Sequence, residues 1–356
     1  MVRKQRISAL SIVLAVLFCL SMGHAQDGLI LVVTLIRHGD RMPIYSIKSS
    51  PINWKLGPGE LTPLGMNQEY QLGKSFRARY VDQLGFLPPQ YGINKIYVRS
   101  TDYNRTIMSA QSFLCGLYPP GTGPTLDNGD PALPDGYQPI PVKIVPEAHD
   151  RILLGTSYKE RFEEMVREYV IITDEWIKMT SSCSDKFDRW SKIFAANIRD
   201  LLDLILPADD LNVRMLKGVQ LPEGLTEAEA REIVKCSQWA LAQKYKPRNI
   251  SCLLARDFMH EIVTHMEKAM EGTQPYRFIL YSGHDTTLLS VLSMLGTPLE
   301  YQPPYNSNVS FELYRNKEGY FVKVLYNEND ITIHGNMGRT PCPFERFRKI
   351  ILDESW

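Results

Sequence analysis

Two arginines and a histidine directly follow an apolar run in the stretch VVTLIRHGDRMP, residues 32–43. A strand that ends here places Arg37, His38 and Arg41 in a tight turn, and burying that much positive charge is costly unless an anion compensates it. Guanidinium groups pair with phosphate oxygens in bidentate fashion better than lysine does. The stretch therefore predicts an oxyanion site at the end of the first strand.

Two later apolar runs end in polar residues of the same kind. One is followed by Arg105 in the first turn of a helix, and the other runs into His284 and Asp285 just before a helix. In open parallel α/β sheets the ligand crevice lies at the carboxyl ends of the strands, and helix N-termini there favour phosphate. Taken singly, Asp285 could cap its helix and Arg105 could be an exposed helix residue. Together the three strand ends predict one phosphate pocket.

Strands and helices alternate at both ends of the chain, which is the pattern that must position these residues. Apolar runs that predict strands lie at residues 29–36, 94–100, 276–282, 308–314 and 319–326. Thr62 and Pro63 suit the N-cap and the first position of a helix after the first strand. This alternation favours a mostly parallel α/β sheet, and the last two runs resemble antiparallel edge strands.

A mostly helical block separates the two α/β parts. Residues 119–146 are rich in proline and glycine, which predicts a boundary, and in residues 187–206 apolar side chains recur at helical spacing. Thr226 and Glu229 form a capping-box pattern ahead of another helix. We predict an α/β domain made of residues 26–131 and 251–356, with a smaller helical cap domain inserted at residues 132–250.

The N-terminal residues have the pattern of a secretory signal peptide. A basic start, a short apolar run and small residues before Ala25 predict removal of residues 1–25. The rest holds 37 lysines and arginines (40 minus three) against 40 acidic residues, net −3, which argues against binding nucleic acid. No later apolar run is long enough for a bilayer, so we expect no membrane span after signal removal. We expect a protein of the secretory pathway, either secreted or in the lysosomal lumen.

The cysteines and the glycosylation triplets are consistent with a protein of the secretory pathway. Without the signal, five cysteines remain, which allows at most two internal disulfides in an oxidising compartment. They are Cys115, Cys183, Cys236, Cys252 and Cys342. Asn249 and Asn308 begin candidate N-glycosylation triplets. Asn104 begins a third, which we expect to be unused because a glycan there would start beside Arg105.

Three motifs, RHGDRMP, RSTDYNRT and SGHDTT, resemble the signatures of the histidine acid phosphatase family, most closely those of its prostatic and lysosomal branch. The resemblance covers nearly all of the mature chain. It implies a doubly wound α/β domain like that of the phosphoglycerate mutases, with a helical cap, and hydrolysis of phosphate monoesters through a phosphohistidine. It also implies a small phosphomonoester or phosphoprotein as substrate, and a homodimer.

The resemblance assigns roles by motif position. His38 resembles the nucleophile, and Asp285 resembles the proton donor to the leaving alcohol. The positions that resemble phosphate ligands are Arg37, Arg41, Arg105 and His284. We expect no metal and no cofactor, because arginines can neutralise the charge of the phosphoryl group. The same charge should lower the pKa of His38 and keep it nucleophilic at acid pH, whereas Asp285 must hold its proton.

Other functions fit parts of the sequence. HEIVTH resembles a zincin motif, but His260 and His265 lie about 140° apart on a helix and cannot share a metal. No Gly-x-Ser-x-Gly elbow indicates a serine hydrolase, and phosphotransfer as in the mutases suits a secreted protein poorly. Two alternatives stay open: hydrolysis of inositol polyphosphates, and a secreted binding protein that keeps the fold without catalysis. A chromogenic phosphomonoester assay at acid pH separates the binding protein from an enzyme.

Overall fold

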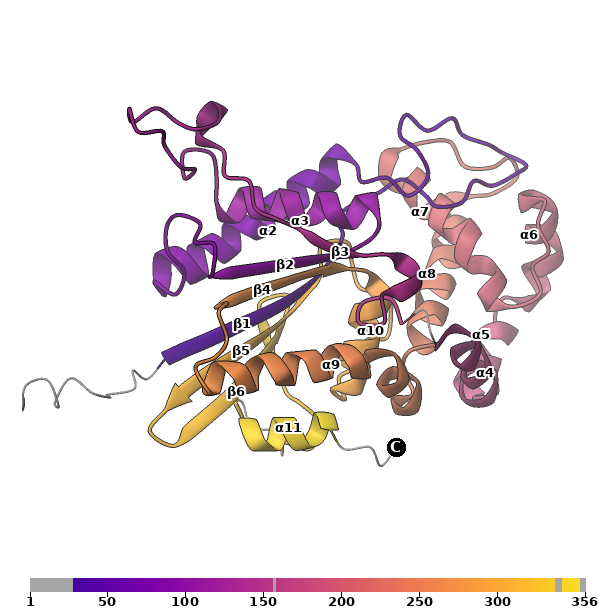
Figure 1. Ribbon diagram of the computed structural model, residues 1–356. Helices are drawn as coiled ribbons and strands as arrows, with labels where there is room; N and C mark the ends of the chain where they lie inside the picture. Colours follow the sequence, from indigo (N-terminus) through magenta and orange to yellow (C-terminus); the bar gives the residue numbers. More distant parts are fainter. Residues whose placement is uncertain (1–27, 156–157, 337–340, 353–356) are drawn as a thin grey trace, which may run out of the picture.

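The computed structural model describes residues 28–155, 158–336 and 341–352, and the predicted signal peptide lies outside them. One sheet runs through the centre, with strand order β3-β2-β4-β1-β5-β6-β7 and β8 paired to β6 (Figure 1). The parallel strands are β1 (Gly28–Arg37), β2 (Ile96–Thr101), β3 (Lys143–Val145) and β4 (Phe278–Gly283). The antiparallel strands are β5 (Asn308–Asn316), β6 (Gly319–Tyr326), β7 (Asn329–Ile331) and β8 (Cys342–Pro343). The predicted α/β sheet with antiparallel edge strands is confirmed.

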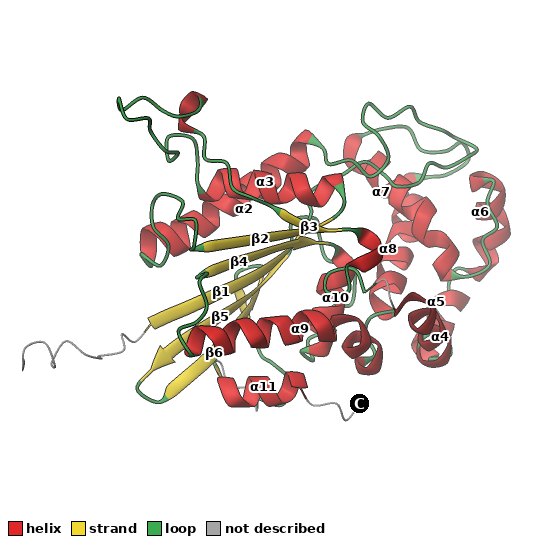
Figure 2. Ribbon diagram, viewed as in Figure 1, coloured by secondary structure: helices red, strands yellow, loops and turns green. Residues whose placement is uncertain are grey.

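Helices cover both faces of the sheet (Figure 2). One face carries α2 (Pro63–Arg77) and α3 (Asn104–Leu117). The other face carries α9 (Arg248–Met270), α10 (Asp285–Met294) and α11 (Phe344–Leu352). Side chains of β1 alternate between the two layers: Val33 and Leu35 pack toward α9, and Val32 and Ile36 pack toward α2 and α3. A strand buried on both faces needs the near-continuous apolar run that the sequence has.

The remaining helices form a group beside the sheet, which we call the helical region. It consists of α4 (Lys159–Tyr169), α5 (Asp174–Ser181), α6 (Phe187–Phe194), α7 (Ile205–Lys217) and α8 (Glu227–Gln243). Its side chains build a hydrophobic cluster of their own around Trp190 and Phe194. Helix α8 begins with the predicted capping box of Thr226 and Glu229, and α2 begins with the predicted N-cap Thr62.

Two sequence-based boundaries differ from the structure. The insertion predicted to start at residue 132 starts later, because β3 still pairs with β2 in the sheet and the first helix of the helical region begins at Lys159. The apolar pattern of residues 187–206 is not one helix. Ala195 adopts a left-handed conformation with φ of 48°, which ends α6, and Asp200 then caps a short 3-10 turn before α7.

The described cysteines and helices bear on the expected compartment. The five cysteines of the described residues are all free thiols in this structure, so the disulfides that an oxidising compartment allows are not seen among them. Within residues 28–155, 158–336 and 341–352, none of the helices has both the length and the apolar content needed to cross a bilayer.

Candidate active site

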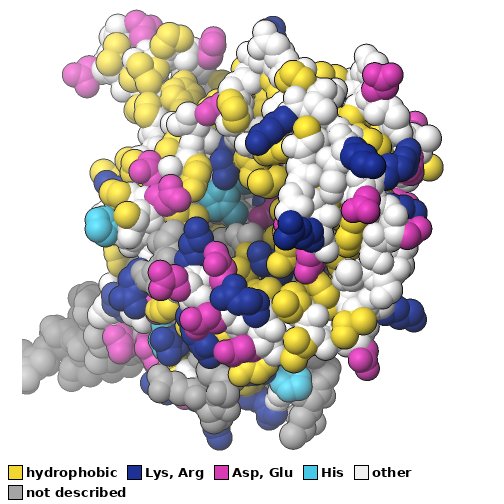
Figure 3. Space-filling model, turned by 90° about the vertical axis from the view of Figure 1, so that its right-hand side faces the viewer, with side chains coloured by type: hydrophobic (Ala, Val, Ile, Leu, Met, Phe, Trp, Pro, Cys, Tyr) yellow, Lys and Arg dark blue, Asp and Glu magenta, His cyan; other side chains and the backbone are white. Residues whose placement is uncertain are grey.

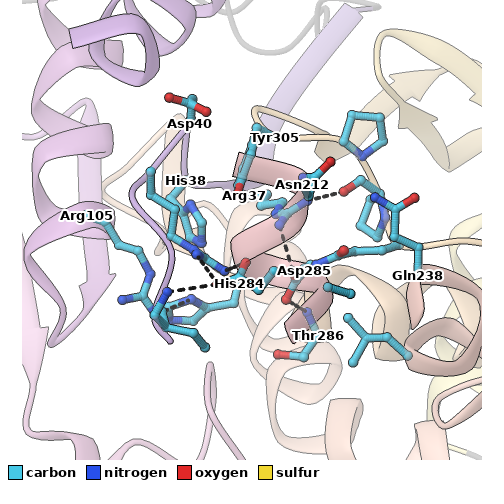
Figure 4. Close-up of a pocket in the computed structure, with 18 of the residues that line it drawn as sticks. Arg37, His38, Asp40, Arg105, Asn212, Gln238, His284, Asp285, Thr286 and Tyr305 are labelled. Atoms are coloured by element: carbon cyan, nitrogen blue, oxygen red, sulfur yellow. Dashed lines mark hydrogen bonds and ion pairs between the residues drawn. The ribbon is translucent and has the colours of Figure 1, made fainter. Parts of the chain in front are cut away.

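The three strand ends singled out in the sequence meet at one place. β1 and β4 are parallel neighbours whose last residues, Arg37 and Gly283, lie side by side, and β2 pairs with the other edge of β4. The backbone N–H of His38 donates to the carbonyl of Gly283 at 3.1 Å. A cavity of about 690 Å³ opens there (Figure 4). All six predicted residues line it: Arg37, His38, Arg41, Arg105, His284 and Asp285.

Close backbone packing holds the turn that carries His38. A side chain at Gly39 would come within 2.4 Å of the carbonyl oxygen of Gly65, in the first turn of α2, so only glycine allows this approach. The backbone N–H of Thr62 donates to the carbonyl of Asp40 at 2.9 Å, and the hydroxyl of Thr62 donates to the Asp40 carboxylate. The N-terminus of α2 is thereby fixed directly against the turn.

The imidazole of His38 is oriented and neutral. Its Nδ1 lies 2.9 Å from the carbonyl oxygen of Gly39. A carbonyl can only accept, so Nδ1 carries the proton and Nε2 keeps its lone pair. Burial, and then the positive charge of Arg37 and the other arginines, lowers the pKa of His38 well below its usual value. The ring is therefore an uncharged base within a cationic pocket, as the sequence predicts.

Each of the three arginines has a buried Nε–H without a protein partner. The guanidinium of Arg37 lies 4.4 Å from the ring centre of Tyr305, and the guanidinium of Arg105 lies at the same distance from Tyr103. Burial and the neighbouring charge of Arg41 lower the pKa of Arg105, because two cations face each other across the cavity. Mutual repulsion and unpartnered donors both call for an anion in this space.

Arg41 is held from the helical region. Its two terminal nitrogens donate to the two carboxylate oxygens of Asp209, on α7, at 3.1 and 2.9 Å. Asp209 also accepts the backbone N–H of Ile44 at 2.8 Å. This bidentate pair fixes the guanidinium plane while Nε stays free. Sequence reasoning missed Asp209, because no motif surrounds it and it lies 168 residues from Arg41.

A chain of hydroxyl groups positions His284. The single hydroxyl hydrogen of Thr106 points to the backbone carbonyls of residues 101 and 103. The oxygen of Thr106 therefore accepts from the hydroxyl of Thr101. The Thr101 oxygen in turn accepts from Nε2 of His284 at 3.0 Å. Nδ1 of His284 then has a lone pair, and it lies 3.5 Å from Arg105. Burial and then the charge of Arg105 lower the pKa of His284 to about 3.

Asp285 is the first residue of α10, and its hydrogen-bond and ion-pair partners favour the ionised carboxylate. One carboxylate oxygen accepts the backbone N–H of Thr286 at 2.7 Å, and the other accepts from Gln302 and lies 2.8 Å from Arg37. Burial favours the neutral acid, but Arg37 and Gln302 outweigh it and lower the pKa of Asp285 to about 2. The proton that the sequence analysis expects on Asp285 therefore requires a change in the surrounding charge.

The comparisons with known proteins agree with this geometry. The family model "Histidine phosphatase superfamily (branch 2)" matches residues 28–239 and 227–327. The chain belongs to this superfamily. The prostatic acid phosphatase of Bos taurus is 34% identical over 340 residues, covering 91% of this chain and 86% of the relative. The lysosomal acid phosphatase of Bos taurus is 31% identical over 349 residues, covering 91% and 78%. These relatives of the branch 2 phosphatase are phosphoric monoester hydrolases.

Solved phytases share the fold of this branch 2 phosphatase. The Klebsiella sp. ASR1 phytase has a TM-score of 0.69 at 17% identity, covering 93% of this chain and 96% of that one. The Hafnia alvei phytase in complex with myo-inositol hexakis sulphate has a TM-score of 0.65 at 15% identity, covering 92% and 97%. At such identities the likeness supports the architecture alone.

The remaining candidate residues lie away from the cavity. Asn308 is 3% exposed and sits in β5 opposite Ile36, so we correct the expectation that it can accept a glycan. Asn249 is partly buried at the start of α9, and Asn104 is exposed, with its amide on Glu60 at 2.9 Å. His265 packs against Tyr281 and Gln274. In the described part of the chain no group of three or more His, Cys, Asp or Glu residues could hold a metal.

Proposed function

We propose that the protein is an acid phosphatase that hydrolyses phosphate monoesters through a phosphohistidine on His38. The observation that carries the proposal is a neutral imidazole with a free Nε2 lone pair, within a pocket where each of three arginines has a buried Nε–H without a protein partner. An uncharged nucleophile surrounded by fixed cations is what attack on a phosphate dianion requires.

In the first step the phosphoryl group lies among Arg37, Arg41 and Arg105. Nε2 of His38 attacks phosphorus, the bond from phosphorus to the ester oxygen breaks, and the leaving oxygen takes a proton from Asp285. The charge of Arg37 is now shared between the phosphate and the Asp285 carboxylate, so its ion pair with Asp285 weakens. The added negative charge also raises the pKa of Asp285 above the value of about 2 that this structure gives. Substrate binding thus supplies the protonated acid.

In the second step water attacks the phosphohistidine. The bond between phosphorus and nitrogen breaks, inorganic phosphate leaves, and the Asp285 carboxylate takes the proton of the attacking water. His284 serves as a phosphate ligand only when Nδ1 gains a proton, because Nε2–H already points to Thr101. The negative charge of bound phosphate favours that proton. Until then Nδ1 of His284 faces Arg105 and helps to place it.

The decisive experiment traps the intermediate. Enzyme mixed with a 32P-labelled phosphomonoester is quenched in denaturant and alkali, which preserves phosphohistidine, and the labelled peptide is mapped. We expect label on His38. His149→Ala, which alters an exposed histidine outside the cavity, is the matched control and should label fully. Label on another residue, or turnover without label, would contradict the mechanism.

Metal removal tests the charge-neutralising role of the arginines. Because three guanidinium groups occupy the place where a metal would act, dialysis against a chelator should leave phosphatase activity within about twofold of the untreated enzyme. A loss of activity that is restored by a divalent ion would contradict this role of the arginines.

The relatives support the proposed compartment and substrate class. Acid phosphatases named prostatic and lysosomal support a place in the secretory pathway or the lysosome, where the low pKa of His38 keeps the nucleophile uncharged. The substrate is a small phosphomonoester or a phosphoprotein. The complete set of three arginines, two histidines and one aspartate disfavours a binding protein without catalysis.

A further inference from the structure

The outer part of the cavity is apolar, in contrast to its floor. Four large hydrophobic side chains line it although about half of each is open to solvent: Ile44 at 49%, Leu64 at 54%, Leu206 at 44% and Leu216 at 61%. We call these four residues the apolar collar. Exposed apolar side chains that gather at the mouth of a cavity, and not singly over a surface, indicate a binding surface for hydrocarbon.

The collar comes from three separate segments. Ile44 follows the turn after β1, Leu64 lies in the first turn of α2, and Leu206 and Leu216 lie at the two ends of α7. Leu154, Val234 and Leu241 also line the same cavity and add to its apolar surface. Figure 3 shows the face of the molecule that is hollowed here, with both hydrophobic and charged side chains around the hollow. Three segments far apart in sequence thus each bring an exposed apolar side chain to the lining of the same cavity.

The charges of the cavity leave little room for a second phosphate. Apart from the three phosphate-binding arginines, the one lysine or arginine among its lining residues is Lys217, and Lys217 is paired with Asp40 at 2.9 Å. Asp209 adds a carboxylate between the floor and the collar. Apart from the catalytic candidates His38, His284 and Asp285, the other polar lining groups are uncharged amides and hydroxyls, such as Asn212 and Gln238. A polyphosphate would thus place its outer phosphates against leucines and a carboxylate, with no unpaired cation to meet them.

We infer that the enzyme prefers monoesters of apolar alcohols, whose hydrocarbon lies on the apolar collar while the phosphate sits on the arginines, and that it discriminates against inositol polyphosphates. The inference rests on the proposed phosphatase activity and names the substrate class of the same site. Aryl and alkyl esters share the required chemistry.

The test is a substrate series. Methyl, propyl and hexyl phosphate measure the gain per methylene, phenyl phosphate and phosphotyrosine measure an aromatic alcohol, and glycerol phosphate and inositol hexakisphosphate are polar comparisons. Transfer of hydrocarbon from water predicts that kcat/KM rises about twofold to fourfold per methylene. Inositol hexakisphosphate should be the poorest substrate. The ratio of the hexyl to the phenyl ester tells which kind of alcohol the collar favours.

Leu206→Gln and Leu216→Gln place a polar side chain of good helix propensity on the collar. Each should lower kcat/KM for hexyl phosphate by about tenfold and for methyl phosphate much less. Ile177→Gln, on α5, changes a leucine-sized residue of similar exposure (53%) outside the cavity and should leave every ratio unchanged. Circular dichroism of the variants checks that they fold.

Two outcomes would overturn the inference. One is a flat dependence of kcat/KM on chain length. If the mass of the protein in solution also doubles with concentration, this result would mean that a second copy of the chain covers the collar. The other is hydrolysis of inositol hexakisphosphate as fast as of hexyl phosphate. Failure of the phosphatase assignment looks different, because then no ester of the series, methyl phosphate included, is hydrolysed.

Discussion

The floor of the cavity and the wall opposite differ in origin and in chemistry. The floor is built by the ends of β1, β2 and β4, and it holds the buried cations and His38. The wall is contributed largely by α7 of the helical region, and it presents leucines, an amide and one carboxylate. Strand ends are fixed on both sides by neighbouring strands, whereas a helix surface can change its side chains at little cost to the fold. Under the proposals above, the strand ends carry the reaction, whereas α7, together with Ile44 and Leu64, sets the selectivity.

The largest effect should come from the floor. His38→Ala removes the atom that becomes phosphorylated, so kcat for p-nitrophenyl phosphate should fall by at least about 10⁴-fold. Steady-state kinetics at acid pH measure it, with the exposed His149→Ala as the control. Near wild-type turnover by His38→Ala would mean that the floor does not carry the reaction.

The second effect concerns how the two regions are joined. Asp210 and Arg214, both fully buried on α7, form an ion pair, and they also bind the backbone of residues 47 and 50 beyond the first strand. Asp210→Ala leaves a buried, unpaired guanidinium and should lower the free energy of unfolding by about 3–5 kcal/mol. Chemical denaturation measures the loss. Arg231→Ala, which breaks an exposed pair on α8, should cost less than about 1 kcal/mol. Equal losses of stability for Asp210→Ala and Arg231→Ala would show that the buried pair does not stabilise the contact between α7 and residues 47–50.

Asp285 should have an effect that depends on the leaving group. Asp285→Asn cannot donate a proton, so kcat for an alkyl phosphate should fall by about 10²–10⁴-fold, and that for p-nitrophenyl phosphate by much less. In the wild type, activity should persist far below pH 6.5, because the lowered pKa of His38 keeps it neutral, and should fall toward neutral pH as Asp285 loses its proton in the complex. Equal losses for both esters would remove Asp285 as the acid.

The smallest effect should come from Asp209, a positioning residue on the wall. Without its two acceptors Arg41 loses its fixed orientation, so Asp209→Ala should raise KM about tenfold with little change in kcat. Asp209→Asn keeps one acceptor and should restore part of the loss, whereas Asp188→Ala, exposed on α6, should change nothing. A fall in kcat alone, or no difference between Ala and Asn, would contradict a positioning role.

The sequence predicts the floor better than the wall for a physical reason. Parallel neighbouring strands must end at the same edge, so a motif after each strand is enough to bring Arg37, Arg105 and His284 together. Local rules also predict the start of α2 at Thr62 and the capping box at Thr226. Contacts between distant segments, such as Arg41 with Asp209, have no local signal.

Other differences between the sequence-based predictions and the structure also depend on contacts that local sequence patterns do not reveal. Strand β3 has three residues and no alternation, so nothing marked it as part of the sheet. The left-handed Ala195 ends α6 within an apolar pattern that continues across it, because Phe194 before it and Ile198 and Leu201 after it all pack into the same hydrophobic cluster. Asn308 begins a candidate glycosylation triplet, but the strand that contains it pairs with β1, and the side chain is buried.

The position of β1 between β4 and β5 has a consequence for heat inactivation. A central strand, hydrogen-bonded along both edges and covered by helices on both faces, opens only when the whole domain opens, so its amides should exchange with solvent among the slowest. His38, the proposed nucleophile, follows this strand directly, and its backbone N–H donates to the carbonyl of Gly283 at the end of β4. Warming should therefore abolish turnover at the temperature where the protein melts as a whole, with no earlier loss from local fraying.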